Sequence, residues 1–212
     1  MTTMYWWMHW LEYLGVIAFA ASGAFLAQKK RMDVFGVSVL GLAAATGGGV
    51  FRDLLLGITP PTMFRDPIFA FIAIGTSLVT MIPVLRKLGN AHPAQRDHIV
   101  GIMDTAGLGV FTVLGVRTAI AAFPDSNLFL LCFIGVITGC GGGILRDLLA
   151  GETPAVFCKR IYAVACLAGA LICALLWKLS PFAAMIVGTL AVVSLRNISE
   201  HYHWNLPGGS QE

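Results

Sequence analysis

Residues 47–60 read Gly47-Gly48-Gly49-Val50-Phe51-Arg52-Asp53-Leu54-Leu55-Leu56-Gly57-Ile58-Thr59-Pro60, and residues 141–154 read Gly141-Gly142-Gly143-Ile144-Leu145-Arg146-Asp147-Leu148-Leu149-Ala150-Gly151-Glu152-Thr153-Pro154. Ten of these fourteen positions are identical at a spacing of 94 residues. Each copy places three adjacent glycines and an Arg-Asp pair within a long apolar stretch. The chain therefore contains a duplicated unit, and the duplicated signature carries charges that are costly to bury in lipid.

The composition is that of a membrane protein. Apolar residues make up 57% and charged residues 12% of the 212 residues, whereas soluble domains have about 45–50% apolar and about 25% charged residues. The charges gather in short clusters between apolar runs, so the net charge of +3 does not indicate a nucleic-acid partner. The five cysteines show no metal-ligand spacing, and we interpret them as small buried packing residues. Neither a metal nor a cofactor is predicted.

Seven apolar runs are expected to cross the bilayer as helices, because about 20 apolar residues span its hydrocarbon core. The runs are continuous rather than alternating, which favours an all-α bundle over a β-barrel. The expected spans are residues 10–27, 34–56, 67–85, 99–116, 128–150, 161–177 and 181–195. Span 7 is the shortest of them.

Lysine and arginine are unequally divided between the two sides of these spans. One side and the final tail carry nine, namely Lys29, Lys30, Arg31, Arg86, Lys87, Arg96, Lys159, Arg160 and Arg196. The other side carries three, namely Arg65, Arg117 and Lys178. Cytoplasmic loops are enriched in basic residues, so the amino terminus is predicted outside and the carboxyl terminus in the cytoplasm.

The duplication predicts two repeats of opposite orientation in a single membrane domain. Spans 1 to 3 form one repeat over residues 10–86, and spans 4 to 6 form a second over residues 99–177. Three is an odd number, so the second repeat must enter the membrane from the opposite face. Residues 181–196 form span 7 without a partner, and residues 197–212 are expected to be a cytoplasmic tail.

Two interpretations of the glycine triplets stay open. Small residues at a spacing of four let two helix backbones approach closely. Each glycine also costs about 1 kcal/mol of helix propensity, so a triplet favours a bend or local unwinding that could serve as a hinge. The candidate hinges are Gly47, Gly48, Gly49, Gly141, Gly142 and Gly143. Each signature should end its helix at Gly57 or Gly151, with a proline just beyond.

The charged residues within the spans are candidates for function, since burying a charge at the bilayer centre costs about 2.5–3.5 kcal/mol. Adjacent helix residues point about 100° apart, so each Arg and Asp is expected to pair with another segment. The alternative is that the arginines, one turn from a span end, extend toward the lipid headgroups. The candidates are Arg52, Asp53, Asp104, Arg146 and Asp147. Glu12 is expected at the membrane interface.

These motifs resemble the prokaryotic branch of the trimeric intracellular cation (TRIC) channel family, which is also grouped as a bacterial glycine transporter family. The resemblance covers nearly the whole chain. It rests on the two signatures, on Asp104-Thr105-Ala106-Gly107-Leu108-Gly109, and on Tyr162-Ala163-Val164-Ala165. It implies homotrimers of seven-helix subunits in a bacterial or archaeal inner membrane, with a pore inside each subunit between spans 2 and 5. It also implies permeability to potassium, sodium and other monovalent cations.

A passive cation channel is therefore the leading hypothesis, with a pore lined by glycine carbonyls, the acids, and polar residues such as Ser38, Thr46 and Thr138. The alternative is a secondary transporter of glycine or another small solute that uses the same hinges. A structural membrane scaffold would leave the same duplication. An enzyme is not predicted, because the triple glycine lacks the Lys-Ser/Thr of a phosphate-binding loop and no nucleophile-base pair is evident.

Overall fold

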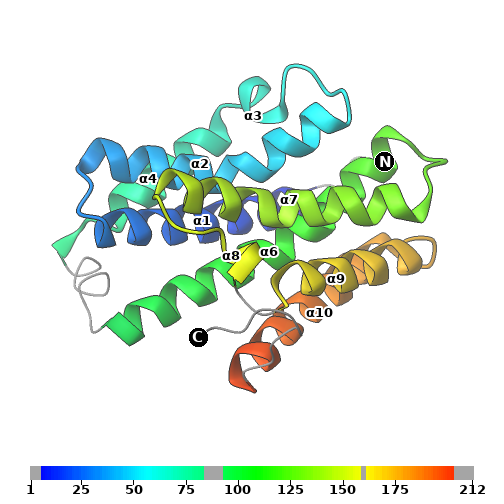
Figure 1. The fold of residues 1–212 in the computed structure, drawn as a ribbon. Helices are drawn as coiled ribbons and strands as arrows, with labels where there is room; N and C mark the ends of the chain where they lie inside the picture. Colours follow the sequence, from blue (N-terminus) through cyan, green and yellow to red (C-terminus); the bar gives the residue numbers. More distant parts are fainter. Residues whose placement is uncertain (1–5, 84–92, 159–160, 203–212) are drawn as a thin grey trace.

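The structure, a computed structural model, describes residues 6–83, 93–158 and 161–202. Within these ranges the chain forms helices and connecting turns without any strand, so the predicted all-α fold is confirmed. In the labels of Figure 1, the helices are α1 (Trp6–Lys29), α2 (Val34–Leu55), α3 (Thr62–Arg65), α4 (Ile68–Val79), α6 (Pro93–Ala122), α7 (Leu128–Leu149), α8 (Ala155–Cys158), α9 (Tyr162–Leu176) and α10 (Pro181–His201).

Five helices in the described ranges are long and apolar enough to cross a membrane: α1, α2, α6, α7 and α10. The two remaining expected spans, 3 and 6, correspond to the shorter apolar helices α4 and α9. The end of expected span 3 lies outside the described residues. The shortest expected span, 181–195, corresponds to a helix of 21 residues that continues to His201.

The basic residue Arg196 is not in a tail. It lies within α10 with 1% of its surface exposed. Its guanidinium donates to Glu200 at 2.5 Å and lies 5.0 Å from the ring centre of Tyr162 on α9. Because Arg196 is buried, it cannot count as a loop charge. The unequal division of the other lysines and arginines between the loops still favours a cytoplasmic carboxyl terminus.

The order of helices α2, α3 and α4 in the first half is repeated by α7, α8 and α9 in the second half. Both α2 and α7 have 22 residues, and their bounds differ by 94 positions. Each begins at a polar N-cap, Asp33 or Asn127, whose side chain accepts from the backbone N–H three residues later. Each is followed by a one-turn helix, α3 or α8, and then by a longer apolar helix, α4 or α9. Local chemistry thus repeats along with the sequence.

The centre of the molecule is the contact between α2 and α7. Figure 1 shows the two helices side by side and running in opposite directions, with α1 and α6 packed against them. A Cβ on Gly48 would collide with the carbonyl oxygen of Thr138, and one on Gly142 would collide with that of Ala44. These two collisions involve positions that correspond at a spacing of 94. The glycines therefore let the two backbones touch.

Of the bend or local unwinding expected at the triplets, local unwinding is wrong, because α2 and α7 are unbroken helices through residues 47–49 and 141–143. A bend at the triplets stays a prediction. Close packing against the facing helix explains this outcome. The close contact between the backbones of α2 and α7 compensates for the low helix propensity of the glycines. Both segments therefore remain helical. Of the two interpretations, close approach is the one that the geometry displays.

Candidate functional site

Each copy of the signature ends at a glycine in the left-handed conformation. Gly57 has φ +69° and Gly151 has φ +67°. The N–H of Ile58 donates to the Asp53 carbonyl at 2.8 Å, and that of Glu152 donates to the Asp147 carbonyl at 2.9 Å. This is the Schellman arrangement, which glycine adopts without steric cost. The predicted helix ends are therefore confirmed.

The two aspartates hold the short helix that follows each signature. Asp53 Oδ2 accepts from the backbone N–H of Thr62 at 2.7 Å, and Asp147 Oδ2 accepts from that of Ala155 at 2.9 Å. These N–H groups begin α3 and α8, where no preceding turn supplies an acceptor. A carboxylate is a strong acceptor for such groups. Each Asp therefore fixes the chain as it turns back at the end of α2 or α7.

The same carboxylates pair with the arginines beside them. Arg52 Nε donates to Asp53 Oδ1 at 2.8 Å, and Arg146 Nε donates to Asp147 Oδ1 at 2.9 Å. The expectation that adjacent residues would not pair is wrong, because the guanidinium stem is long enough to curl back. Both arginines are buried, at 6% and 3% exposed, so they do not extend toward the headgroups.

Arg146 makes further contacts across the bundle. Its Nη1 donates to the hydroxyl of Ser22 on α1 at 2.5 Å and to Asp104 Oδ1 on α6 at 2.6 Å. With Asp147, one guanidinium therefore joins α1, α6 and α7. Asp104 is 5% exposed, so it is an interior residue and not an interfacial one. Arg52 has a simpler environment: among the described residues, its side-chain partner is Asp53.

Two cavities lie at these charged pairs. The Arg52 cavity has a volume of about 40 Å³ and is lined by Glu12, Val16, Ala45, Thr46, Gly49, Val50, Arg52, Asp53, Thr62, Met63, Phe69 and Phe111. The Arg146 cavity has a volume of about 340 Å³ and is lined by Phe25, Leu26, Lys29, Asp97, Val100, Arg146, Asp147, Glu152, Thr153, Ala155 and Cys158.

The two cavities meet α1 near its opposite ends. Glu12 lines the first cavity and Lys29 the second. The helix from Glu12 to Lys29 rises by roughly 25 Å, which is close to the hydrocarbon thickness of a bilayer, about 30 Å. The α2–α7 contact and the side chains of the central core lie between them.

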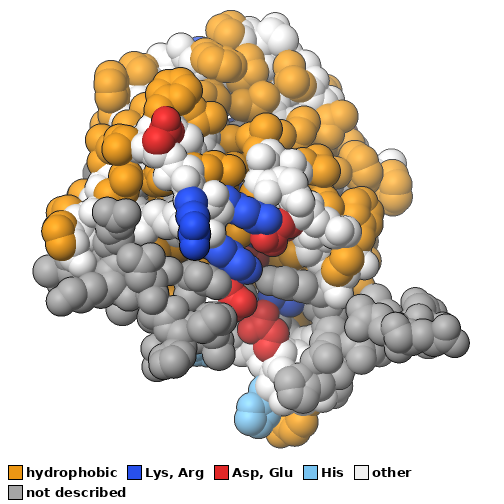
Figure 2. All heavy atoms as spheres, turned by 60° about the vertical axis from the view of Figure 1, so that its left-hand side comes forward, with side chains coloured by type: hydrophobic (Ala, Val, Ile, Leu, Met, Phe, Trp, Pro, Cys, Tyr) orange, Lys and Arg blue, Asp and Glu red, His pale blue; other side chains and the backbone are white. Residues whose placement is uncertain are grey.

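The Arg146 cavity opens beside a cluster of charges. Lys29 lies 3.5 Å from Asp97 and 4.0 Å from Glu152, and Lys30 lies 3.1 Å from Glu152. Figure 2 shows basic and acidic side chains gathered on one part of an otherwise largely apolar surface. These pairs join the end of α1, the start of α6 and the turn after α7. Partly exposed ion pairs of this kind contribute little to the stability of the fold.

The predicted polar lining is only partly brought together. Thr46 lines the Arg52 cavity. Ser38 and Thr138 are not among the described residues that line either cavity; each hydroxyl donates to the carbonyl four residues earlier, at 2.9 Å and 2.6 Å. Of the glycines, Gly49 lines the Arg52 cavity. A Cβ on Gly143 would lie 2.7 Å from the Tyr162 hydroxyl and 3.5 Å from Asp104.

Glu12 and Cys158 are among the lining residues that were not predicted at the cavities. Glu12, expected at the interface, lines the Arg52 cavity and lies 3.9 Å from Arg117 and 3.5 Å from His9. Cys158 is exposed and lines the Arg146 cavity, unlike the other four cysteines, which are buried. The sequence signal for Glu12 was an acidic residue near the start of an apolar run, but the helices that pack against it could not be read from the sequence.

The family model described as "Glycine transporter" matches residues 9–83 and 101–178. A membrane protein of Deinococcus radiodurans is 39% identical over 206 residues, covering 94% of this chain and 91% of that protein. The inner membrane protein YadS of Escherichia coli strain K12 is 36% identical over 204 residues, covering 94% and 95%. The chain belongs to the family that this model describes.

Solved structures extend the likeness to three dimensions. A prokaryotic TRIC channel crystallised in 0.5 M KCl has a TM-score of 0.87 and 32% identity, covering 96% of this chain and 100% of that one. The TRIC channel orthologue from Rhodobacter sphaeroides has a TM-score of 0.84 and 29% identity, covering 93% and 98%. The family is thus the one that includes the prokaryotic TRIC channels, and the chain is an all-helical membrane protein with their fold.

Proposed function

We propose that the protein is a cation channel, permeable to potassium and other monovalent cations, with one pore in each subunit of a homotrimer. The observation that carries this proposal is the pair of cavities near opposite ends of α1, each with a buried Arg-Asp pair, on either side of the α2–α7 contact. The likeness to solved TRIC cation channels supports it. Two polar recesses separated by an apolar constriction would suit a pore that is gated by the exclusion of water.

The proposed architecture has seven spans, with α2 to α4 and α7 to α9 belonging to two inverted repeats, over residues 10–86 and 99–177. The 94-residue offset of their bounds and the opposite directions of α2 and α7 support this arrangement. Span 7 is α10. In the proposed orientation, the Arg146 cavity and the carboxyl terminus face the cytoplasm, and the Arg52 cavity and the amino terminus face outside. The excess of basic residues supports this orientation.

The proposed gate lies where α2 and α7 touch. Gly47 to Gly49 and Gly141 to Gly143 permit a bend there because they carry no side chain that would oppose it. Asp53 and Asp147 hold the turns beyond each triplet, so motion would concentrate at the glycines. Thr46, Asp104 and the Arg-Asp pairs supply the polar groups along the pore. Lipids surround the trimer.

The test is planar-bilayer recording of the purified protein under potassium and sodium gradients. Discrete current steps that reverse near the equilibrium potential of the cation are expected. Saturable glycine uptake by proteoliposomes without current steps would instead support the second candidate, a secondary transporter, which the name of the family model favours. Absence of both activities in protein that assembles would contradict the proposal.

A further inference from the structure

One face of α1 extends from the Arg52 cavity to the Arg146 cavity. Residues spaced three or four apart share a face of a helix, and this face carries Glu12, Val16, Phe19, Ser22, Leu26 and Lys29. Glu12 and Val16 line the first cavity, and Leu26 and Lys29 line the second. Ser22 accepts a hydrogen bond from Arg146. Phe19 is thus the apolar residue at the middle of a face that is polar at both ends.

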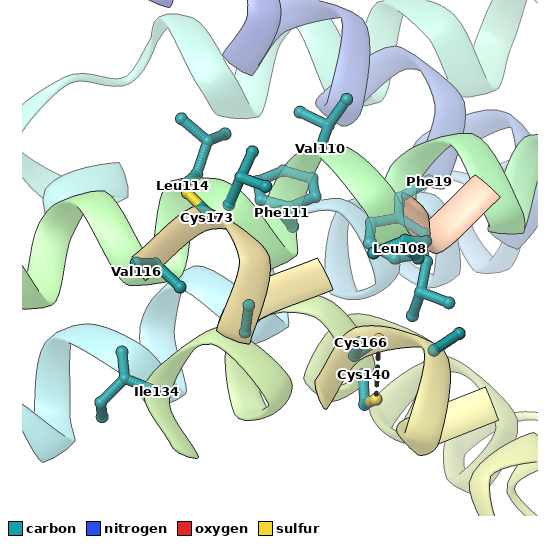
Figure 3. Packing of buried hydrophobic residues seen from close by; sticks show 14 of the residues in the cluster. Phe19, Leu108, Val110, Phe111, Leu114, Val116, Ile134, Cys140, Cys166 and Cys173 are labelled. Carbon is teal, nitrogen blue, oxygen red and sulfur yellow. Dashed lines mark hydrogen bonds between the residues drawn. The ribbon is translucent and has the colours of Figure 1, made fainter. Parts of the chain in front are cut away.

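The ring of Phe19 fills the space between the helices that surround it. It is 1% exposed and stacks on Phe111 of α6, with ring centres 5.4 Å apart and planes at 12°. A Cβ on Gly107 of α6 would lie 2.8 Å from its ring, and one on Gly142 of α7 would lie 3.6 Å from it. Figure 3 shows Phe19 among the buried side chains. The ring occupies room that two glycines leave free.

The neighbours of this ring lie at one cavity and near the other. Phe111 lines the Arg52 cavity, and Gly142 lies on α7 four residues before Arg146, which lines the Arg146 cavity. A benzyl side chain offers an ion no group to replace the water that it would lose, so an ion at this position would pay the full cost of desolvation. Apolar constrictions of this kind close pores by excluding water.

We propose that Phe19 is the residue that closes the path between the two cavities, and that α1 forms one wall of this path. The inference rests on the proposed channel function and assigns its barrier to a residue outside both signatures. In the closed state the ring lies on Gly107 and next to Gly142. Conduction requires the ring to leave this position, by rotation of its side chain or by a shift of α1 along α6.

Single-channel recording of Phe19→Ala tests the assignment. Removal of the ring opens a hydrated route between Glu12 and Ser22, so the time-averaged potassium current per channel should rise on the order of tenfold or more. The matched control is Leu114→Ala on α6, which also truncates a fully buried side chain but lines neither cavity among the described residues. Its current should stay at the level of the unaltered protein.

Phe19→Leu provides the same test with a smaller loss of volume, in case Phe19→Ala does not assemble. It should raise the current in the same direction but by less. Unchanged or reduced current in an assembled Phe19 variant, or an equal rise in Leu114→Ala, would overturn the assignment. If the unaltered protein conducts and the variants do not exceed it, this inference fails while the channel stands; if the unaltered protein carries no cation current, the proposed function itself fails.

Discussion

The two copies of the signature share one frame but differ in what surrounds it. In both, an aspartate binds its neighbouring arginine and the next short helix, and a left-handed glycine ends the long helix. Arg146 also binds Ser22 and Asp104 and stands at a cavity of about 340 Å³, whereas Arg52 stands at one of about 40 Å³. The signature builds the turn, and residues outside it make the two cavities different.

The largest effect is expected where the copies differ most. Arg146→Gln removes three partners and leaves Asp104 as a buried charge, so the free energy of unfolding should fall by about 3–5 kcal/mol. Arg52→Gln leaves Asp53 still bonded to the Thr62 N–H and should cost less. Denaturant unfolding of the detergent-purified protein measures both. Equal losses in the two variants would remove the distinction between the copies.

The Arg146 site also predicts coupling between its members. Asp104→Asn should recover part of the stability lost by Arg146→Gln, because it neutralises the charge that the first change leaves unpaired. The interaction free energy in a double-mutant cycle should lie within about 0.5–3 kcal/mol. Additive losses would show that Asp104 does not depend on Arg146.

Where the copies agree, equivalent changes should have equivalent effects. Gly48→Ala and Gly142→Ala each drive a Cβ into a backbone carbonyl of the facing helix and should each cost about 1–3 kcal/mol. Gly75→Ala on α4, where a Cβ would meet nothing within 4 Å, is the control and should be neutral or slightly stabilising. If the losses in free energy of unfolding of the two variants differed by more than their mean, the two sides of the contact would not be equivalent.

The smallest effect is expected at the Asp147 carboxylate, which caps α8. Asp147→Asn retains an oxygen acceptor and leaves Arg146 its pair with Asp104, so it should lower the free energy of unfolding by about 1–2 kcal/mol. Asp53→Asn also retains the acceptor but leaves the buried Arg52 without its carboxylate partner, so it should cost more. Both should also loosen the turns, which hydrogen exchange at the Thr62 and Ala155 amides can detect. Unchanged exchange at both amides would refute the capping role.

Local sequence chemistry predicted the parts of this fold that depend on neighbouring residues. The five long apolar helices and the helix ends at Gly57 and Gly151 follow from hydropathy and glycine-proline spacing. What it did not predict depends on partners far along the chain. The glycine triplets stay helical because the backbone of the facing helix packs against them. Arg196 is buried because its guanidinium packs on the Tyr162 ring and forms an ion pair with Glu200.

The candidate site followed the same rule. Intramembrane charge singled out Arg52, Asp53, Asp104, Arg146 and Asp147, and the structure places all five at or beside the two cavities. Phe19 carries no such signal, since one phenylalanine among many apolar residues is indistinguishable until its glycine neighbours on α6 and α7 are known. Ser38 and Thr138 carried a polar signal but satisfy their hydroxyls within their own helices.

The central claim is that the two cavities are opposite mouths of one path within each subunit. The native Cys158 reports on the Arg146 cavity, and Thr46→Cys in a Cys158→Ser background reports on the Arg52 cavity. During bilayer recording, a membrane-impermeant methanethiosulfonate reagent should lower the current through Cys158 only from the cytoplasmic side and through Thr46→Cys only from the other side. Modification of both from the same side, or labelling of both without any change in current, would contradict the claim.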